Sequence, residues 1–236
     1  MALKSLGRLR HGAIDAPERP PLESAPLENV EATIPQLSPT VAAMVQFQLL
    51  TGCRPTEACN LTMAEINWDD PGCWVFRPEH HKMIHLGRHR AIPILANAQV
   101  ILMPFLRADG LPLFPPADYQ EEWECWKRAA RKSKVQPSQV HRSKPEPKVT
   151  PGDRYETASY RKSISRACQR AGVKTWSPNS LRKLAVAHTL EIDVARALLG
   201  HSDTGIIQRH YARHDLQQAM AGARALQTKA ISKCAA

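Results

Sequence analysis

The sequence lacks the features that would place the protein in a membrane or among disulfide-linked secreted proteins. No uninterrupted apolar run reaches the roughly 18 residues that a membrane-spanning helix needs. The basic N-terminus, MALKSLGRLRHGA, has neither an apolar core nor a cleavage site, so it is not a secretory signal. The six cysteines are scattered and form no CxxC pair, which favours reduced, mostly buried thiols over disulfides or zinc ligands. We therefore expect a cytoplasmic protein.

What the chain does contain is a local excess of positive charge. Its net charge is +10, and residues 127–170 alone hold thirteen Lys/Arg against three Asp/Glu, so the rest of the chain is balanced. Such an excess favours a surface that faces a polyanion, although a solvated basic loop would have the same composition. At 236 residues the chain is long enough for one sizeable domain, or one domain with an appendage.

We divide the chain into an N-terminal arm or linker, residues 1–36, and one domain, residues 37–236. The arm holds five prolines and few periodic apolar positions, and only a brief helical turn is expected, near residues 28–32. Ser38 and Pro39 are of the residue types that cap and begin a helix, so the domain is predicted to open there, with a helix to residue 50.

The domain is predicted to be mainly helical with one small sheet. Strands are expected at residues 74–77 and 90–94, and residues 80–87 between them should form a hairpin or a third strand. The proline-rich, basic stretch 136–154 is the best candidate for an exposed insertion. Apolar periodicity predicts the further helices 54–61, 96–106, 118–132, 157–171, 180–190, 194–199, 204–211 and 216–226.

Four side chains in distinctive settings have the chemistry that cleavage of a DNA phosphodiester without a metal requires. Arginine meets two phosphate oxygens at once and stays charged in a closed site. A tyrosine phenol both attacks phosphorus and leaves again, which keeps the bond energy for resealing. The four are Arg54 in TGCRPTEACNLT, Arg182 in WSPNSLRK, and His201 and Tyr211 in LLGHSDTGIIQRHYAR.

Together these motifs resemble those of the tyrosine recombinase, or phage integrase, family. The resemblance covers about residues 37–228 and implies an α+β, mainly α-helical catalytic domain with a small antiparallel β-sheet. It implies a site-specific recombinase that breaks and rejoins DNA. In that reaction Tyr211 forms a 3′-phosphotyrosyl link, while Arg54 and Arg182 bind the scissile phosphate. His201 adds a hydrogen bond to the phosphate or positions the tyrosine.

The resemblance assigns roles to three further residues. Lys82, in EHHKMIHLGRHRAIPI, matches the hairpin lysine that protonates the departing 5′-oxygen. Glu57 matches the glutamate that supports the first arginine from one helical turn away. Asn179 stands where the family has a histidine; it donates a hydrogen bond but does not titrate, so we expect chemistry slowed by about 10- to 1000-fold.

Double-stranded DNA is the partner that the resemblance implies, with no metal or other cofactor. The histidines of residues 80–89 are an alternative metal site, but the Cys or Asp ligands that would complete a closed zinc site are absent from this stretch. A homotetramer on DNA is expected to form through the C-terminal helix 216–226, at a cytoplasmic, nucleoid-associated location. The basic residues expected to bind DNA are Arg88, Arg90, Lys144, Lys148, Arg154, Arg161 and Lys162.

Two departures from the family pattern leave alternatives open. Between Arg182 and His201 the family usually has about four more residues, which is close to one helical turn. The matched region also contains only the catalytic side of the family's DNA clamp, without the N-terminal core-binding domain. The main alternative is therefore a truncated, catalytically silent, DNA-binding remnant of an integrase. A further alternative is a type IB topoisomerase-like enzyme that relaxes supercoils as a monomer.

Overall fold

The computed structural model describes residues 24–80, 84, 89–108, 110–137, 151–187 and 219–224. It has a mainly helical fold with one small antiparallel sheet, which confirms the predicted fold class. The helices are α1 (Leu27–Thr33), α2 (Pro39–Thr51), α3 (Pro55–Asn60), α4 (Ala96–Leu102), α5 (Pro116–Ala129), α6 (Thr157–Ala171) and α7 (Pro178–Ala187). Short 3-10 turns lie at η2 (Ile34–Gln36), η3 (Met63–Glu65) and η5 (Met103–Phe105).

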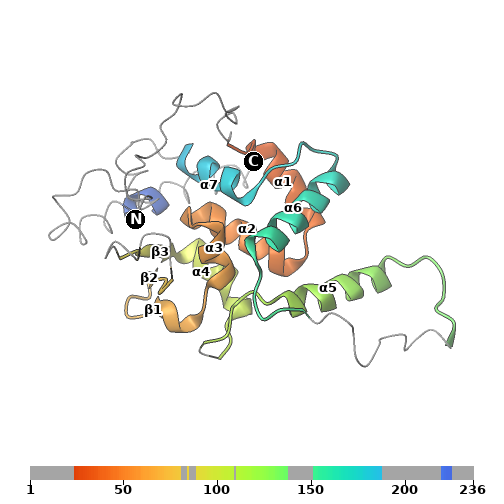
Figure 1. Cartoon of the computed structure of the whole chain (residues 1–236), viewed down its shortest axis with the longest axis horizontal. Helices are drawn as coiled ribbons and strands as arrows, with labels where there is room; N and C mark the ends of the chain where they lie inside the picture. The colour runs from red at the N-terminus through yellow and green to blue at the C-terminus, as the bar shows by residue number, and fades with distance from the viewer. Residues whose placement is uncertain are drawn as a thin grey trace, which may run out of the picture.

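Helix α2 forms the centre of the core. It begins as predicted, because the Ser38 hydroxyl accepts the N–H of Val41 (3.4 Å) and proline takes the first position. Buried side chains lie all around it, and it packs against α4, α5, α6 and α7. In Figure 1, α2 lies between the sheet on the left and α1 and α6 on the right. Gly52 ends the helix with φ at 63°, a left-handed conformation that glycine adopts without strain.

The sheet has three strands in the order β1-β2-β3, all antiparallel. Strand β2 (Cys73–Phe76) pairs with β3 (Ile92–Leu95), so both predicted strands are confirmed with small shifts in their ends. The third strand is β1 (Ile66–Asn67), on the other edge of β2. Two residues are too few to display a strand's alternation of apolar and polar positions, which is why β1 was not predicted. Most of the predicted hairpin 80–87 lies outside the described residues.

Helix α5 extends away from the rest of the fold (Figure 1). The carboxylate of Glu122 ties it to the start of α2 by accepting the backbone N–H (3.2 Å) and the hydroxyl (2.8 Å) of Thr40. Trp123 and Trp126 lie three residues apart on this helix, and their rings stack with centroids 4.8 Å apart. A helix at residues 118–132 is thereby confirmed, displaced by two or three residues.

Residues 24–36 differ from the predicted arm. Helix α1 packs against α6, and Ala25, Val30 and Thr33 are buried in the same core as α2. The Trp176 indole N–H donates to the Thr33 hydroxyl (3.2 Å), which fastens this segment to the loop before α7. The segment has too few apolar residues to show a helical period, so the sequence alone did not reveal that it belongs to the core. Residues 1–23 of the predicted arm lie outside the described part of the chain.

Residues 219–224 are helical, within the predicted C-terminal helix. Ala223 packs against Cys73, Val75 and Leu95 of the sheet in its own chain. The predicted helices 194–199 and 204–211 lie outside the described residues, as do residues 138–150 of the insertion. All five described cysteines are free thiols and four are buried, as predicted. None of the described helices is both long and apolar enough to cross a membrane.

Candidate active site

Arg54 is presented by the turn that joins α2 to α3. It occupies the residue before the first helical position of α3, where the backbone is extended. Its backbone N–H donates to one Glu57 carboxylate oxygen (2.6 Å) and its guanidinium to the other (2.8 Å). The predicted contact between Glu57 and the first arginine is therefore present, and it holds the guanidinium by a charge-assisted bond three residues away.

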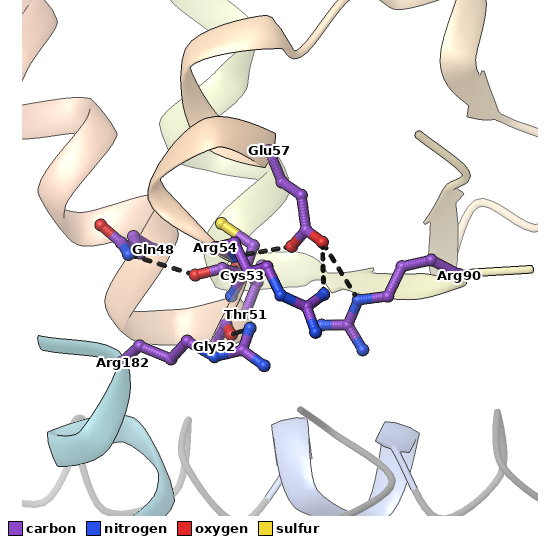
Figure 2. Close-up of polar contacts among 8 residues, drawn as sticks. All are labelled: Gln48, Thr51, Gly52, Cys53, Arg54, Glu57, Arg90 and Arg182. Atoms are coloured by element: carbon purple, nitrogen blue, oxygen red, sulfur yellow. Dashed lines mark hydrogen bonds and ion pairs between the residues drawn. The ribbon is translucent and has the colours of Figure 1, made fainter. Parts of the chain in front are cut away.

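Arg90 reaches the same carboxylate from the segment before β3, with its Nε 3.5 Å from Glu57 Oε1 (Figure 2). Glu57 is 2% exposed and Arg90 is 6% exposed. Burial alone would raise the pKa of Glu57, but Arg90, Arg54 and the Arg54 N–H outweigh it and hold this pKa below its usual value. Glu57 is thus a buried carboxylate that serves two arginines.

Arg182 comes from α7 and meets the turn that carries Arg54. Its guanidinium donates to the carbonyl oxygen of Gly52 (2.7 Å), across 130 positions of sequence. Burial, with added repulsion from Arg90 and Arg54, lowers the pKa of Arg182 to about 9, so it remains charged at pH 7. Figure 2 shows the guanidinium groups of all three arginines on one side of the turn.

The two predicted phosphate-binding arginines open on one groove. It has a volume of about 1190 Å³ and is lined by Arg54, Arg182, Asn179, Arg161 and Lys174, among others. The exposed Asn179 lies on α7, one turn before Arg182. No acidic residue is among the described residues that line the groove. Four cations with no carboxylate among the described lining residues give the groove the charge and the hydrogen-bond donors that suit an anion with several oxygens.

The other predicted catalytic and DNA-binding residues fall into three groups. Arg154, Arg161 and Lys162 are exposed, and the guanidinium of Arg154 lies 3.5 Å from the Asn60 side-chain oxygen. Arg90 is not on an exposed surface: its burial against Glu57 places it inside the arginine cluster, so a direct contact with DNA stays a prediction. The residues that lie outside the described part of the chain are Lys82, Arg88, Lys144, Lys148, His201 and Tyr211.

Sequence reasoning missed two residues at the site. Lys174, in the loop before α7, lines the groove, and no motif distinguishes it from other loop lysines. Gln48 is fully buried in α2 and bonds to the backbone of both arginine segments. Its signal was present in the sequence, because a glutamine on the apolar face of a predicted helix must find buried partners. Among the described residues, no His/Cys/Asp/Glu group is placed to hold a metal.

Fold and site together define a mainly helical domain that gathers arginines from distant segments beside one basic groove. Residues 27–218 match the family model described as the phage integrase family, and the chain belongs to that family. This match covers all the described site residues, from Gln48 to Arg182.

The chain resembles solved structures of the same kind at low sequence identity. An integrase from mycobacterium phage Brujita is 15% identical with a TM-score of 0.53, and the match covers 92% of this chain and 64% of that one. The XerH site-specific recombinase bound to difH substrate is 16% identical with a TM-score of 0.45, over 76% of this chain and 47% of that one. The XerA recombinase is 16% identical with a TM-score of 0.45, and the match covers 86% of this chain and 67% of that one.

These likenesses concern the fold, and the chain spans only about half to two thirds of the length of these structures. A comparison with curated proteins gave no match.

Proposed function

We propose that this protein is a site-specific DNA recombinase that breaks and rejoins DNA through a 3′-phosphotyrosyl intermediate. One observation carries the proposal. Arg54 and Arg182, from opposite ends of the domain sequence, are joined at Gly52 and line one basic groove. Two guanidinium groups around one phosphate supply the electrostatic stabilisation that a metal would otherwise provide.

In the proposed reaction, the arginines hold the scissile phosphate while Tyr211 attacks it. The phenol loses its proton to water and its oxygen bonds to phosphorus. The bond from phosphorus to the 5′-oxygen breaks, and Lys82 gives a proton to that oxygen. Asn179 and His201 donate hydrogen bonds to the phosphate. A 5′-hydroxyl of the partner strand then attacks the phosphotyrosine and returns its proton to Lys82, while the released Tyr211 oxygen takes up a proton from water. This sequence uses no metal and no nucleotide.

The proposed substrate is double-stranded DNA, held by charge along the groove and beyond it. Arg161 lines the groove, while Lys162 and Arg154 are exposed nearby in the sequence. Binding by such cations displaces condensed counterions and is therefore steeply dependent on salt. Recombination on DNA would require four protomers, and we propose that they associate through residues 216–226. We also propose that the protein acts in the cytoplasm, at the nucleoid.

A second candidate, a catalytically silent DNA-binding protein, is favoured by one observation. Asn179 is exposed in the groove at the place of the family's histidine, and an amide does not carry a proton to or from the phosphate. Such a protein would keep the arginine site and the basic surface and would bind DNA without cleaving it.

Covalent trapping on a suicide substrate separates the two candidates. The substrate is nicked DNA from the gene's own flanks, on which the short leaving strand diffuses away and cleavage cannot reverse. A recombinase yields a covalent protein–DNA band in the wild type that is lost in Tyr211→Phe. Salt-sensitive binding without any band, also in a longer chain that adds an N-terminal core-binding domain, would establish the silent protein.

A further inference from the structure

Gln48 joins the two segments that carry the arginine pair. Its side chain is fully buried, and its amide nitrogen donates to the carbonyl oxygens of Cys53 (3.1 Å) and Pro178 (2.9 Å). Cys53 directly precedes Arg54, and Pro178 begins α7 directly before Asn179. Figure 2 shows the first of these bonds. A single buried amide is therefore bonded to both halves of the site.

The orientation of this amide is fixed from its other end. The hydroxyl of Tyr160, on α6, donates to the Gln48 side-chain oxygen (3.1 Å). An amide nitrogen carries two hydrogens, so Cys53 and Pro178 each take one. Both carbonyl oxygens thus lie within 3.1 Å of the same atom. A shift of either segment relative to the other breaks one of these bonds.

A second connection closes a ring around the same turn. The backbone N–H of Gly52 donates to the backbone oxygen of Gln48 (2.9 Å), and the Gly52 carbonyl accepts the Arg182 guanidinium (2.7 Å). Bonds therefore run from Gln48 to Pro178, along α7 to Arg182, and through Gly52 back to Gln48. The spacing of the two arginine segments is set by this ring, in which the Gln48 side chain bonds to both segments.

We infer that Gln48 is a positioning residue for phosphate attack: it sets the separation of Arg54 and Arg182 without touching DNA. The inference rests on the proposed function, and it names a residue that affects the rate of the proposed DNA cleavage. Filling the core does not require an amide here, because methionine has a similar volume and length. Positioning does require it, because a reactant displaced by about 1 Å can cost about 100-fold in rate.

The test compares Gln48→Met with Thr40→Val, a matched control on the same helix. Thr40 is also fully buried and also makes a polar tie to another element, but that tie runs to α5 through Glu122. Single-turnover cleavage of the suicide substrate is measured at saturating DNA, together with the Kd for DNA. All measurements are made well below the unfolding midpoint of both variants, so that each is fully folded.

Gln48→Met is expected to cleave about 10- to 100-fold more slowly than wild type with less than a threefold change in Kd. Thr40→Val is expected to cleave at the wild-type rate. The inference is overturned if Gln48→Met cleaves normally, or if Thr40→Val loses as much rate at a similar loss of stability. If Gln48→Met does not fold, Tyr160→Phe takes its place. It removes the bond to the amide oxygen and is expected to slow cleavage about fivefold; an unchanged rate contradicts the inference.

Tungstate, a tetrahedral phosphate mimic, separates failure of this inference from failure of the proposed function. If the wild type forms no covalent complex but binds tungstate by calorimetry, the recombinase proposal fails and the affinities decide the role of Gln48. Tungstate binding at least fivefold weaker in Gln48→Met, but unchanged in Thr40→Val, supports positioning of the arginine pair. Equal affinities overturn it. A wild type that neither cleaves DNA nor binds tungstate contradicts both proposals.

Discussion

The two arginines of the site are held in different ways. Arg54 keeps an 18% exposed side chain and bonds to a carboxylate three residues along its own helix. Arg182 is buried, and its guanidinium bonds to a backbone carbonyl brought from the far end of the domain. A local contact therefore builds one half of the site, whereas the tertiary fold builds the other. The comparison teaches that the charge balance of the site depends on Glu57 and its geometry on the packing of α2 against α7.

The largest expected effect comes from breaking the charge balance on the Arg54 side. Glu57→Gln removes the buried carboxylate that Arg54 and Arg90 share. Loss of one partner from a buried ion pair typically costs about 3 to 5 kcal/mol of unfolding free energy. The matched control is Asp118→Asn, which breaks an ion pair to Arg107 that is about one third exposed and should cost about 0 to 1 kcal/mol. Urea denaturation of both variants measures the difference.

The pH dependence of the same variant checks the charge explanation. Because the pKa of Glu57 is lowered in the folded state, its ionisation stabilises the fold above the unfolded pKa of roughly 4.3. That contribution is lost as the pH falls through the lower, folded value. The stability gap between wild type and Glu57→Gln should therefore be full at pH 7 and narrow below about pH 4. A gap independent of pH would assign the loss to packing.

The second-largest effect is expected from a substitution on α7, the helix that carries both Asn179 and Arg182. Asn179→His adds a group that titrates near neutral pH and can carry a proton at the phosphate. We expect single-turnover cleavage to rise by about 10- to 1000-fold and its pH profile to gain a further titration near neutral pH, from the new imidazole. Asn179→Gln, which keeps the amide, serves as control. No gain at any pH between 6 and 8 would show that this position does not limit the chemistry.

A third test replaces each arginine by lysine. Burial and the neighbouring arginines already lower the pKa of Arg182 to about 9, and lysine starts from a lower intrinsic value. Arg182→Lys should therefore be largely neutral at pH 8 and bind tungstate about tenfold more weakly there than at pH 6. The Arg54→Lys variant places its lysine beside the Glu57 carboxylate and should bind tungstate equally well at both pH values. The same pH response in both variants would contradict the contrast between the two arginines.

The smallest effect is expected from the basic stretch 136–154. Charge reversal of Lys144, Lys148 and Arg154 together should weaken DNA binding on all sequences alike and reduce the salt dependence by about one unit per lost phosphate contact. The cleavage rate at saturating DNA should not change, because these residues only hold the duplex. Unchanged affinity would remove the 136–154 insertion from the DNA-binding surface. Fluorescence anisotropy at several salt concentrations provides the measurement.

Local sequence predicted those parts of the molecule whose contacts are local. The helix at 157–171 was predicted with its observed limits, since its apolar residues repeat at helical spacing. The contact of Glu57 with Arg54 was implied by the resemblance to the family, and it is local because three residues span one helical turn. Arg90 was assigned to the DNA surface, yet it is buried, because its carboxylate partner lies on a different element.

The parts that sequence did not predict depend on the fold as a whole. The bond of Arg182 to Gly52 crosses 130 positions, and the two bonds of Tyr160 and Pro178 to Gln48 cross 112 and 130. No local pattern encodes such pairs. The basic groove likewise exists only because α3, α6 and α7 meet there, and the resemblance to the family named its arginines without showing how they are held.

The most direct test of the central claim, that Arg54 and Arg182 act on one phosphate, is a double-mutant cycle. Single-turnover cleavage of the suicide substrate is measured for Arg54→Ala, Arg182→Ala and the double variant. Residues that act as one unit are strongly non-additive, so the double variant should cleave within about threefold of the slower single variant. If instead the two reductions in rate multiply, the arginines act independently, and the shared phosphate site is contradicted.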